Sequence, residues 1–357
     1  MILLIRVIVF IAVVILISAA VAGFIPPSSG YIFALAGLGF PYFWMVNAFL
    51  LLLLLILRKR FEIIVVLTTL IITTPLITRY FSVNLKGNPK TAIYSIFDLN
   101  TFGLRKPFTK SDQLAYQDSL NQYLNRNEYT LACFQEYPIK GSKHAPFYKK
   151  LMDELEYPYK ALSEYDPDEK ATQYILLIAS QYPVLNQQTL YFEGLPFAMY
   201  ADIKFPEKVI RVYTAHMMSV KLTGEKKVLM LDKGESLRGI VNHVKIAVEK
   251  LIIAFAKREQ QCRIIRESID NSNFPVILAG DFNDTPVSYT YHQLGHNLKN
   301  ASDFSFTGLK KTYRLSKFPL QIDYILHDNS INSSGYQKMS LGFSDHYAIS
   351  SLFSINN

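Results

Sequence analysis

The chain has 357 residues and carries 37 lysines and arginines against 29 aspartates and glutamates, so its formal net charge is +8. Half of the residues are hydrophobic and 18% are charged, a composition that excludes a disordered or fibrous protein. The first 85 residues hold six charged side chains, whereas residues 86–357 hold 32 basic and 28 acidic ones. This small surplus of positive charge argues against a surface that coats nucleic acid. Two regions are predicted, an anchor at 1–85 and a globular domain at 86–357.

Three apolar stretches are predicted to cross a membrane, at about residues 2–24, 31–57 and 62–80. The first holds one charge and the second none, and each exceeds the roughly 20 residues that a spanning helix needs. The third is shorter and contains Pro75, but the charged residues at its rims can still reach the headgroups. A removable signal peptide is the alternative for the first stretch, because residues 18–22 offer a small-residue cleavage site. Nothing in these stretches indicates transport, so they are interpreted as an anchor in the lipid bilayer.

The basic residues predict how the anchor is oriented. The strongest basic cluster beside any apolar stretch is Arg58-Lys59-Arg60, which should face the cytoplasm. With three crossings the N-terminus lies inside as well, and residues 86–357 emerge on the outer, periplasmic face of the cell membrane. With two crossings they would be cytoplasmic.

From residue 90 onward, short β-rich runs alternate with helical stretches. Strands are predicted at residues 91–99, 130–134, 173–179, 198–205, 209–215, 274–279, 321–326 and 347–353. Helices are predicted at residues 112–125, 145–156 and 237–270. The fifth strand follows the fourth after three residues, which is hairpin spacing and implies antiparallel pairing within a mixed sheet of an α/β (α+β) fold. The apolar stripe of the longest helix is expected to face the core, with a membrane-surface role as the alternative.

Charged and polar residues gather at the ends of these predicted strands. They are Glu136, His216, Asp281, Asn283, Asp323, Asp345 and His346. A strand-end carboxylate is more often a turn former or a cap than a catalyst, and a lone histidine is usually structural. Five such strand ends in one domain are harder to explain in that way, because burying charge is costly unless the charge is used. Together they predict a catalytic site.

The same residues resemble the motifs of the endonuclease/exonuclease/phosphatase superfamily. The motifs are Gly280-Asp281-Phe282-Asn283, Ile322-Asp323-Tyr324 and Ser344-Asp345-His346, in this order, with Gln135-Glu136 upstream. The resemblance covers residues 86–357. Within the superfamily the chain is similar to the membrane-anchored bacterial branch typical of Bacteroidetes. There Asp-Thr-Pro-x-Ser-Tyr-x-Tyr follows the Gly-Asp-Phe-Asn motif, as residues 284–291 do here.

The resemblance implies a four-layer sandwich of two mixed, largely antiparallel sheets flanked by helices, and metal-dependent hydrolysis of phosphoester bonds. The substrate would be a nucleic acid, a phospholipid or a small phosphoester, and the enzyme would act as a monomer. Oxygen ligands suit Mg²⁺ or Mn²⁺. The implied ligands are Asp98, Glu136 and Asp345.

The resemblance also implies a role for each remaining candidate. Asp281 would orient and deprotonate the attacking water, and Asn283 would donate to a phosphoryl oxygen without repelling it. His216 and His346 would stabilise the developing negative charge. Asp323 would fix the tautomer and the orientation of His346.

The sequence departs from the family pattern at three places. Asp98 stands where the family has asparagine, and Asn100, two residues on and on the same strand face, is the alternative ligand. Gln181 and Gln321 replace two family arginines. The more negative neighbourhood would hold metal more tightly and phosphate less well. These substitutions motivate an alternative hypothesis, a pseudoenzyme that keeps the fold as a metal- or phosphate-ligand-binding module.

Overall fold

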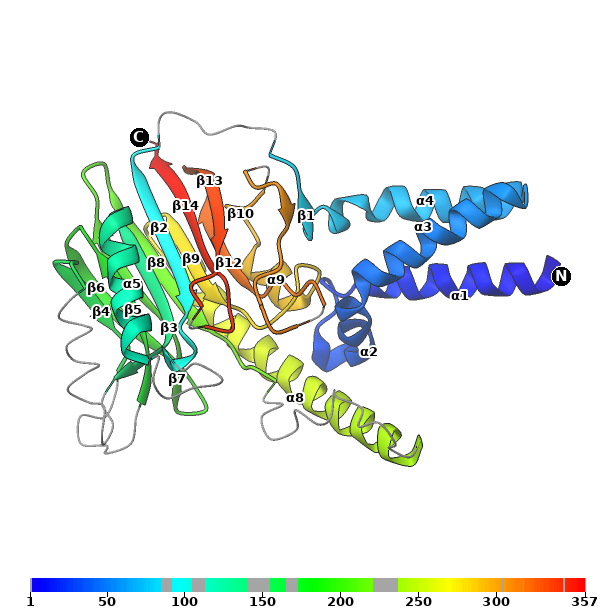
Figure 1. The fold of residues 1–357 in the computed structure, drawn as a ribbon, viewed down its shortest axis with the longest axis horizontal. Coiled ribbons are helices and arrows are strands. Elements are labelled where there is room, and N and C mark those ends of the chain that lie inside the picture. Colours follow the sequence, from blue (N-terminus) through cyan, green and yellow to red (C-terminus); the bar gives the residue numbers. More distant parts are fainter. Residues whose placement is uncertain are drawn as a thin grey trace. The chain divides into compact units, whose positions relative to one another are not determined.

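The computed structural model describes residues 2–84, 92–104, 113–139, 155–164, 173–220, 237–303, 305–316, 318–342 and 344–356 (Figure 1). The chain packs into two compact units. The first comprises Met1–Arg79, Met218–Arg263 and Asn283–Gln293, and the second comprises Tyr80–Met217, Ile264–Phe282 and Leu294–Asn357. The helix predicted at residues 145–156 lies outside the described residues, except for its last two positions, which are not helical.

Four helices at the N-terminus belong to the first unit: α1 (Ile2–Ala20), α2 (Pro27–Leu38), α3 (Phe40–Ile56) and α4 (Arg60–Ile77). By length and composition α1 and α4 can each cross a membrane, and α2 with α3, bent by 58° where they meet, can form a third span. Asn47 of α3 donates from Nδ2 to the Ala12 carbonyl of α1 at 3.1 Å. Arg6 of α1 donates to the Glu62 carboxylate of α4, also at 3.1 Å. Polar contacts of this kind hold apolar helices together, and the second one places the N-terminal ends of α1 and α4 side by side.

The second unit contains two six-stranded sheets and a short two-stranded one. One six-stranded sheet has the order β10 (Leu298–Asn300), β12 (Asp323–Asp328), β9 (Val276–Asp281), β8 (Val209–His216), β7 (Leu195–Lys204) and β6 (Val184–Phe192). The other has the order β13 (Ile331–Met339), β14 (Ala348–Ile355), β2 (Tyr94–Asn100), β3 (Leu131–Ile139), β5 (Gln173–Ser180) and β4 (Tyr159–Leu162). The short sheet pairs β1 (Phe81–Ser82) with β11 (Gly308–Leu309).

Each six-stranded sheet has one parallel pair near its centre, β8 with β9 and β2 with β3, and its other pairs are antiparallel. The sheets are therefore mixed, and β7 and β8 form the antiparallel hairpin that their spacing predicts. All eight predicted strands are present. The structure adds β1, β4, β6, β10, β11 and β13, which are short or, like the polar β6 and β13, show no regular alternation of apolar residues.

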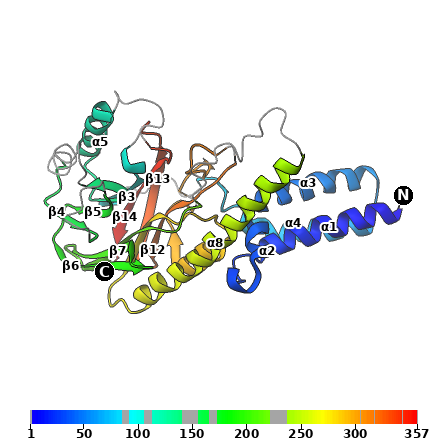
Figure 2. The same ribbon diagram turned by 90° about the horizontal axis from the view of Figure 1, so that it is seen from below.

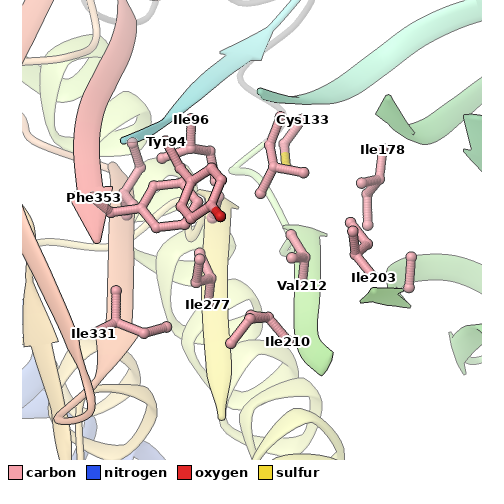
Figure 3. Close-up of a cluster of buried hydrophobic side chains, with 14 of the residues drawn as sticks. Tyr94, Ile96, Cys133, Ile178, Ile203, Ile210, Val212, Ile277, Ile331 and Phe353 are labelled. Carbon is pink, nitrogen blue, oxygen red and sulfur yellow. The ribbon is translucent and has the colours of Figure 1, made fainter. Parts of the chain in front are cut away.

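The two six-stranded sheets pack face to face around one apolar core (Figure 3). In this view Ile96 and Cys133 of one sheet point toward Ile277 and Val212 of the other. These side chains alternate along their strands with residues on the outer faces, as expected for a sheet covered on both sides.

Helices cover the outer faces of the two sheets. On one sheet, Leu120 of α5 (Gln113–Asn127) packs in a second apolar cluster with residues of β2, β3 and β5. On the other, the last turns of α8 (Leu237–Asp270), a long continuous helix (Figure 2), place Ser268 within 2.8 Å of the Tyr213 hydroxyl of β8. The order helix, sheet, sheet, helix is the predicted four-layer sandwich. Two short helices complete the described elements, η1 (Phe102–Leu104) and α9 (Tyr289–Leu294).

Gly280 of β9 is required by the close approach of the two central strands. Its φ is +137°, and a Cβ added to it would lie 2.2 Å from the Ala215 carbonyl oxygen of β8. We expect Gly280→Ala to lower the free energy of unfolding by about 3 kcal/mol or more, because backbone has to move. Gly194→Ala is the matched control, since Gly194 has a φ of +76° but an added Cβ would meet nothing within 4 Å. Urea unfolding followed by circular dichroism measures both losses, and equal losses would contradict this explanation.

Candidate active site

In the second unit, the parallel pair β8–β9 of one sheet and the parallel pair β2–β3 of the other bring side chains to the same place. β8 and β9 end at His216 and Asp281, which are register partners. β2 ends at Asn100, whose partner in β3 is Gln135, the residue before Glu136. Asn100 donates from Nδ2 to Asp281 Oδ2 at 3.1 Å. Side chains from both sheets therefore converge where β2, β8 and β9 end and where β3, which continues to Ile139, has an irregularity in its pairing between Phe134 and Tyr137.

The neighbouring antiparallel strands bring their first residues to the same place. β12 begins with Asp323, the register partner of Asp281. In the segment before β14, the Ser344 hydroxyl donates to the Asn100 carbonyl at 2.6 Å and accepts the His346 N–H at 3.0 Å. These bonds fix the segment that carries His346 against the end of β2.

Two carboxylates and one imidazole form the buried centre of the site. One potential ligand atom from each of Asp281, Asp323 and His346 lies within 4.8 Å of the others. Nδ1 of His346 lies 2.9 and 3.0 Å from the two carboxylate oxygens of Asp323, and Nε2 lies 3.8 Å from Asp281 Oδ2. Asp323 thus holds one ring nitrogen, and the other is left on the side of Asp281.

The charges of this centre favour a protonated imidazole. Burial alone would lower the pKa of His346, but the carboxylates of Asp323 and Asp281 outweigh it and raise this pKa to about 10. For Asp345, burial raises the pKa of the carboxyl above its ordinary value, although the charge of His346 opposes the shift. With Nδ1 held by Asp323, the Nε2–H of an imidazolium can still stabilise negative charge on a bound group.

His216 and Glu136 form a more exposed part of the site. His216 Nε2 lies 3.4 Å from Glu136 Oε1 and 3.8 Å from Asp281 Oδ2. The two side chains are 25% and 30% exposed, whereas that of Asp281 is 1% exposed. Glu136 also has a φ of +50°, a strained conformation for a residue with a side chain, and strain of this kind clusters at functional sites. These partly exposed side chains leave the site open to a ligand from solvent.

The two candidates of the first strand take different places. Asp98 is fully buried, and its Oδ1 accepts a hydrogen bond from Gln135 Nε2 at 2.7 Å, while Gln135 also donates to Thr214 Oγ1 at 2.8 Å. Asn100, not Asp98, donates to Asp281. The geometry therefore favours Asn100 as the side chain of β2 that serves the site, and the assignment of Asp98 as a metal ligand stays a prediction.

Burial, reinforced by the charge of Asp323, raises the pKa of the Asp98 carboxyl well above its ordinary value. The unfolded chain then loses this proton at lower pH than the folded one, so stability falls as pH rises above about 4. Asp98→Asn keeps the shape of the side chain and an acceptor for Gln135. We expect it to raise the melting temperature at pH 7.5 by a few degrees, because each kcal/mol of added stability raises the melting temperature by about 2–4 °C in a protein of this size. The gain should shrink toward pH 4.

Melting curves recorded with a chelator at several pH values test this expectation. Ser95→Ala, a change on the same strand that removes no charge, serves as the control. A gain that does not depend on pH would show that Asp98 is ionised in the folded protein. A variant that instead loses affinity for Mn²⁺ would identify Asp98 as a ligand.

Some residues of the site were not predicted from the sequence. Tyr313 packs edge-on against His346, with 5.3 Å between ring centroids, and its backbone bridges that of His346. Thr312 accepts the Asp323 N–H at 3.1 Å. Both lie in a segment without a periodic pattern or a motif. Asn283, which was predicted, follows Asp281 by two residues, has a φ of +52° and belongs to the first compact unit.

The donor set of the site fits a hard divalent cation. Oδ1 of Asp345 is buried and has no hydrogen-bond partner among the described residues, and the charge of Glu136 acts on the same carboxyl. Carboxylate oxygens of Glu136 and Asp345, together with the Asn100 amide oxygen, are the kind of ligand that Mg²⁺ and Mn²⁺ take in proteins.

Two family models match the sequence. The Endonuclease/Exonuclease/phosphatase family model matches residues 99–346. Residues 2–80 match a model described as a domain of unknown function (DUF8431). A comparison with curated proteins gives no match.

Solved structures share the fold at low sequence identity. An endonuclease/exonuclease/phosphatase family protein from Leptotrichia buccalis has a TM-score of 0.50 at 13% identity, covering 74% of this chain and 100% of that chain. D. rerio TDP2 complexed with single strand DNA product has a TM-score of 0.50 at 15% identity, covering 73% and 98%. The human Nocturnin catalytic domain with bound sulfate anion has a TM-score of 0.51 at 14% identity, covering 75% and 96%. These likenesses concern the fold.

Proposed function

The chain belongs to the endonuclease/exonuclease/phosphatase family, and we propose that it is a membrane-tethered, metal-dependent hydrolase of phosphoester bonds. The observation that carries this proposal is the buried group of Asp281, Asp323 and His346, with Asn100 and Glu136 beside it. An acceptor for a proton, an oriented imidazole and oxygen ligands for a cation are the parts that this reaction needs.

Each side chain has a task that its contacts support. Asp281 accepts the proton of the attacking water, and Asn100 orients its carboxylate. His346 offers Nε2 to the developing negative charge, because Asp323 holds Nδ1. His216 adds a second imidazole. Asn283 donates to a phosphoryl oxygen, a role that rests on the motif.

Glu136 and Asp345 are the proposed ligands of Mg²⁺ or Mn²⁺, with Asn100 as the amide ligand in the place first expected for Asp98. When bound, the cation supplies charge stabilisation to the phosphoryl oxygens that no side chain of the site can replace. The pseudoenzyme hypothesis is not favoured, because the residues that the reaction needs are present and converge at one site despite Gln181 and Gln321.

We place the protein in the membrane-anchored bacterial, Bacteroidetes-type branch and in the cell membrane, with three crossings and the catalytic domain on the outer face. The contact between Arg6 and Glu62 sets the first turns of α1 and α4 at one end of the bundle, which supports two crossings before α4. The length and composition of α4 support the third. A reporter active only outside the cytoplasm, fused after Asn357, should give a signal. A signal from a cytoplasmic reporter would mean that α4 does not cross.

The substrate class follows from the site and the tether. A phosphodiester of a nucleic acid is one candidate, in line with the DNA product bound to D. rerio TDP2, and the headgroup of a phospholipid is the other. A panel with a single-stranded oligonucleotide and lipid vesicles, assayed with the full chain in detergent, separates the two candidates.

Metal removal tests the proposed reaction. Full-length protein in detergent should cleave an aryl phosphodiester with Mg²⁺ or Mn²⁺, lose this activity in a chelator and regain it when metal is added back. Binding of Mn²⁺ without turnover would support the pseudoenzyme instead. Absence of both binding and turnover would refute the metal site.

A further inference from the structure

Residues 283–293 belong to the same compact unit as the four N-terminal helices. This segment starts at Asn283, two residues after Asp281, and includes the run 284–291, for which the proposed reaction has no use. The N-terminal helices match a model described as a domain of unknown function. Three sets of contacts within the unit connect the helices to the segment.

The first set joins the segment to α8. Arg258 is 1% exposed, and its Nε lies 3.3 Å from Oδ2 of the buried Asp284 carboxylate. The same carboxylate accepts the Thr290 hydroxyl at 2.9 Å. Arg258 also donates to the Met218 carbonyl at 2.9 Å. One buried guanidinium therefore holds the residue after Asn283 and the second residue after His216, and a buried charge is kept only where such partners compensate it.

The second set joins α8 to the turn between α1 and α2. Glu259 is 2% exposed, and its two carboxylate oxygens accept the N–H and the hydroxyl of Ser28 at 2.8 and 2.9 Å. Ser28 lies in the first turn of α2, which follows Pro26 and has no side-chain cap of its own. Glu259 thus supplies the missing cap across 231 residues of sequence.

The third set joins the helices to the segment directly. Arg79, just after α4, donates from its guanidinium to the Pro286 carbonyl at 2.9 Å and lies 5.5 Å from the centroid of the Tyr291 ring. At the turn after α1, the ring of Phe24 lies 4.4 Å from that of His292. The helices therefore contact the segment directly at two places, the turn after α1 and the residue just after α4.

The turn after α1 also has a glycine, Gly23, at the point of close contact with the segment. A Cβ added to Gly23 would lie 3.2 Å from both His292 Cβ and the Val287 carbonyl oxygen. The backbone of the turn therefore packs closely against the segment, and an added methyl group would require a neighbour to move by a few tenths of an ångström.

We propose that the N-terminal helices hold segment 283–293 in its working conformation, and that Arg79, Arg258 and Glu259 are the positioning residues of this contact. The helical region is then a part of the hydrolase as well as its anchor. The inference rests on the proposed function for its kinetic consequence, because Asn283 is the first residue of the segment. The holding of the segment has a readout of its own, the hydrogen exchange of its backbone.

The test compares two substitutions at opposite ends of α4 in the full-length protein in detergent. Arg79→Gln replaces the guanidinium that donates to Pro286 with a shorter, uncharged amide, whereas Arg60→Gln removes the same charge from an exposed position at the other end of the helix. We expect Arg79→Gln to speed amide exchange in peptides of 283–293 at least about tenfold and to leave peptides of β7 and β8 unchanged. It should lower kcat for an aryl phosphodiester by about tenfold with little change in KM, since small misplacements of reacting groups are costly.

Glu259→Gln, which acts through α2 and not through α4, should give the same pattern. Arg79→Lys, which keeps the positive charge and a long side chain, should recover part of the loss. Exchange and kcat that match those of the wild type in Arg79→Gln and Glu259→Gln would overturn the proposal and leave the helices as a tether. If the wild type hydrolyses nothing, the proposed function fails, and exchange in 283–293 still decides whether the helices hold the segment. Loss of folding in one variant leaves the other to decide.

Discussion

Asp281→Asn is expected to lower kcat by about three orders of magnitude while the fold is retained, because asparagine can still accept the hydrogen bond of Asn100 but cannot take a proton from water. The side chain is 1% exposed and lies between its register partners His216 and Asp323. Initial rates with an aryl phosphodiester at saturating metal measure the effect. Melting temperature, recorded in parallel, separates lost chemistry from lost folding.

Asp202→Asn provides the matched control for this change. Asp202 is also a buried carboxylate of the second unit, but it pairs with Arg211, at 2.7 Å, on the sheet that carries Asp281. Its loss should lower the melting temperature and leave kcat nearly unchanged. If Asp281→Asn retains more than about a tenth of the wild-type rate, the assignment of Asp281 as proton acceptor is wrong.

The second large effect is expected at Asp323. Its carboxylate holds Nδ1 of His346 at 2.9 Å, so Asp323→Asn keeps the shape of the site but removes the charge that fixes the ring and its protonation. Turnover should fall by about 10²–10⁴-fold, with substrate binding affected far less. Steady-state kinetics of the pure variant, with kcat and KM reported separately, provide the measurement.

Asp328→Asn, at the other end of β12, removes a partly exposed carboxylate that only accepts bonds from Ser330 in the described structure. It should leave turnover unchanged. Comparable losses in Asp323→Asn and Asp328→Asn would mean that the strand, and not the carboxylate beside His346, is what the reaction requires.

The sequence predicts much of this architecture because burial leaves a clear pattern. The eight central strands are buried on both faces, so their sequences are continuous apolar runs. Acidic residues, which are unfavourable to bury, follow directly after several of these runs. Polar edge strands such as β6 and β13 lack the pattern, so they were missed. The sequence could not decide between Asp98 and Asn100, because residues two apart point to the same face of a strand. The structure shows that Asn100 is the one that contacts Asp281.

Contacts between distant segments are the other part that sequence could not supply. Glu259 and Ser28 lie 231 residues apart, and neither stands in a motif or a periodic pattern that names its partner. A domain boundary placed near residue 85 from the sequence therefore cannot show that residues 218–263 and 283–293 pack with the N-terminal helices. Thr312 and Tyr313 were missed for a related reason, since backbone bonds and ring packing to the site leave no trace in composition.

The central claim is that this site uses water to break a phosphoester bond. Its most direct test is hydrolysis of an aryl phosphodiester in H₂¹⁸O by the full-length protein with Mn²⁺, with Asp281→Asn alongside. We predict that phosphorus NMR finds ¹⁸O in the phosphate product of the wild type and none above background in the variant. Absence of hydrolysis by the wild type with either Mg²⁺ or Mn²⁺, or label in the alcohol product, would contradict the account.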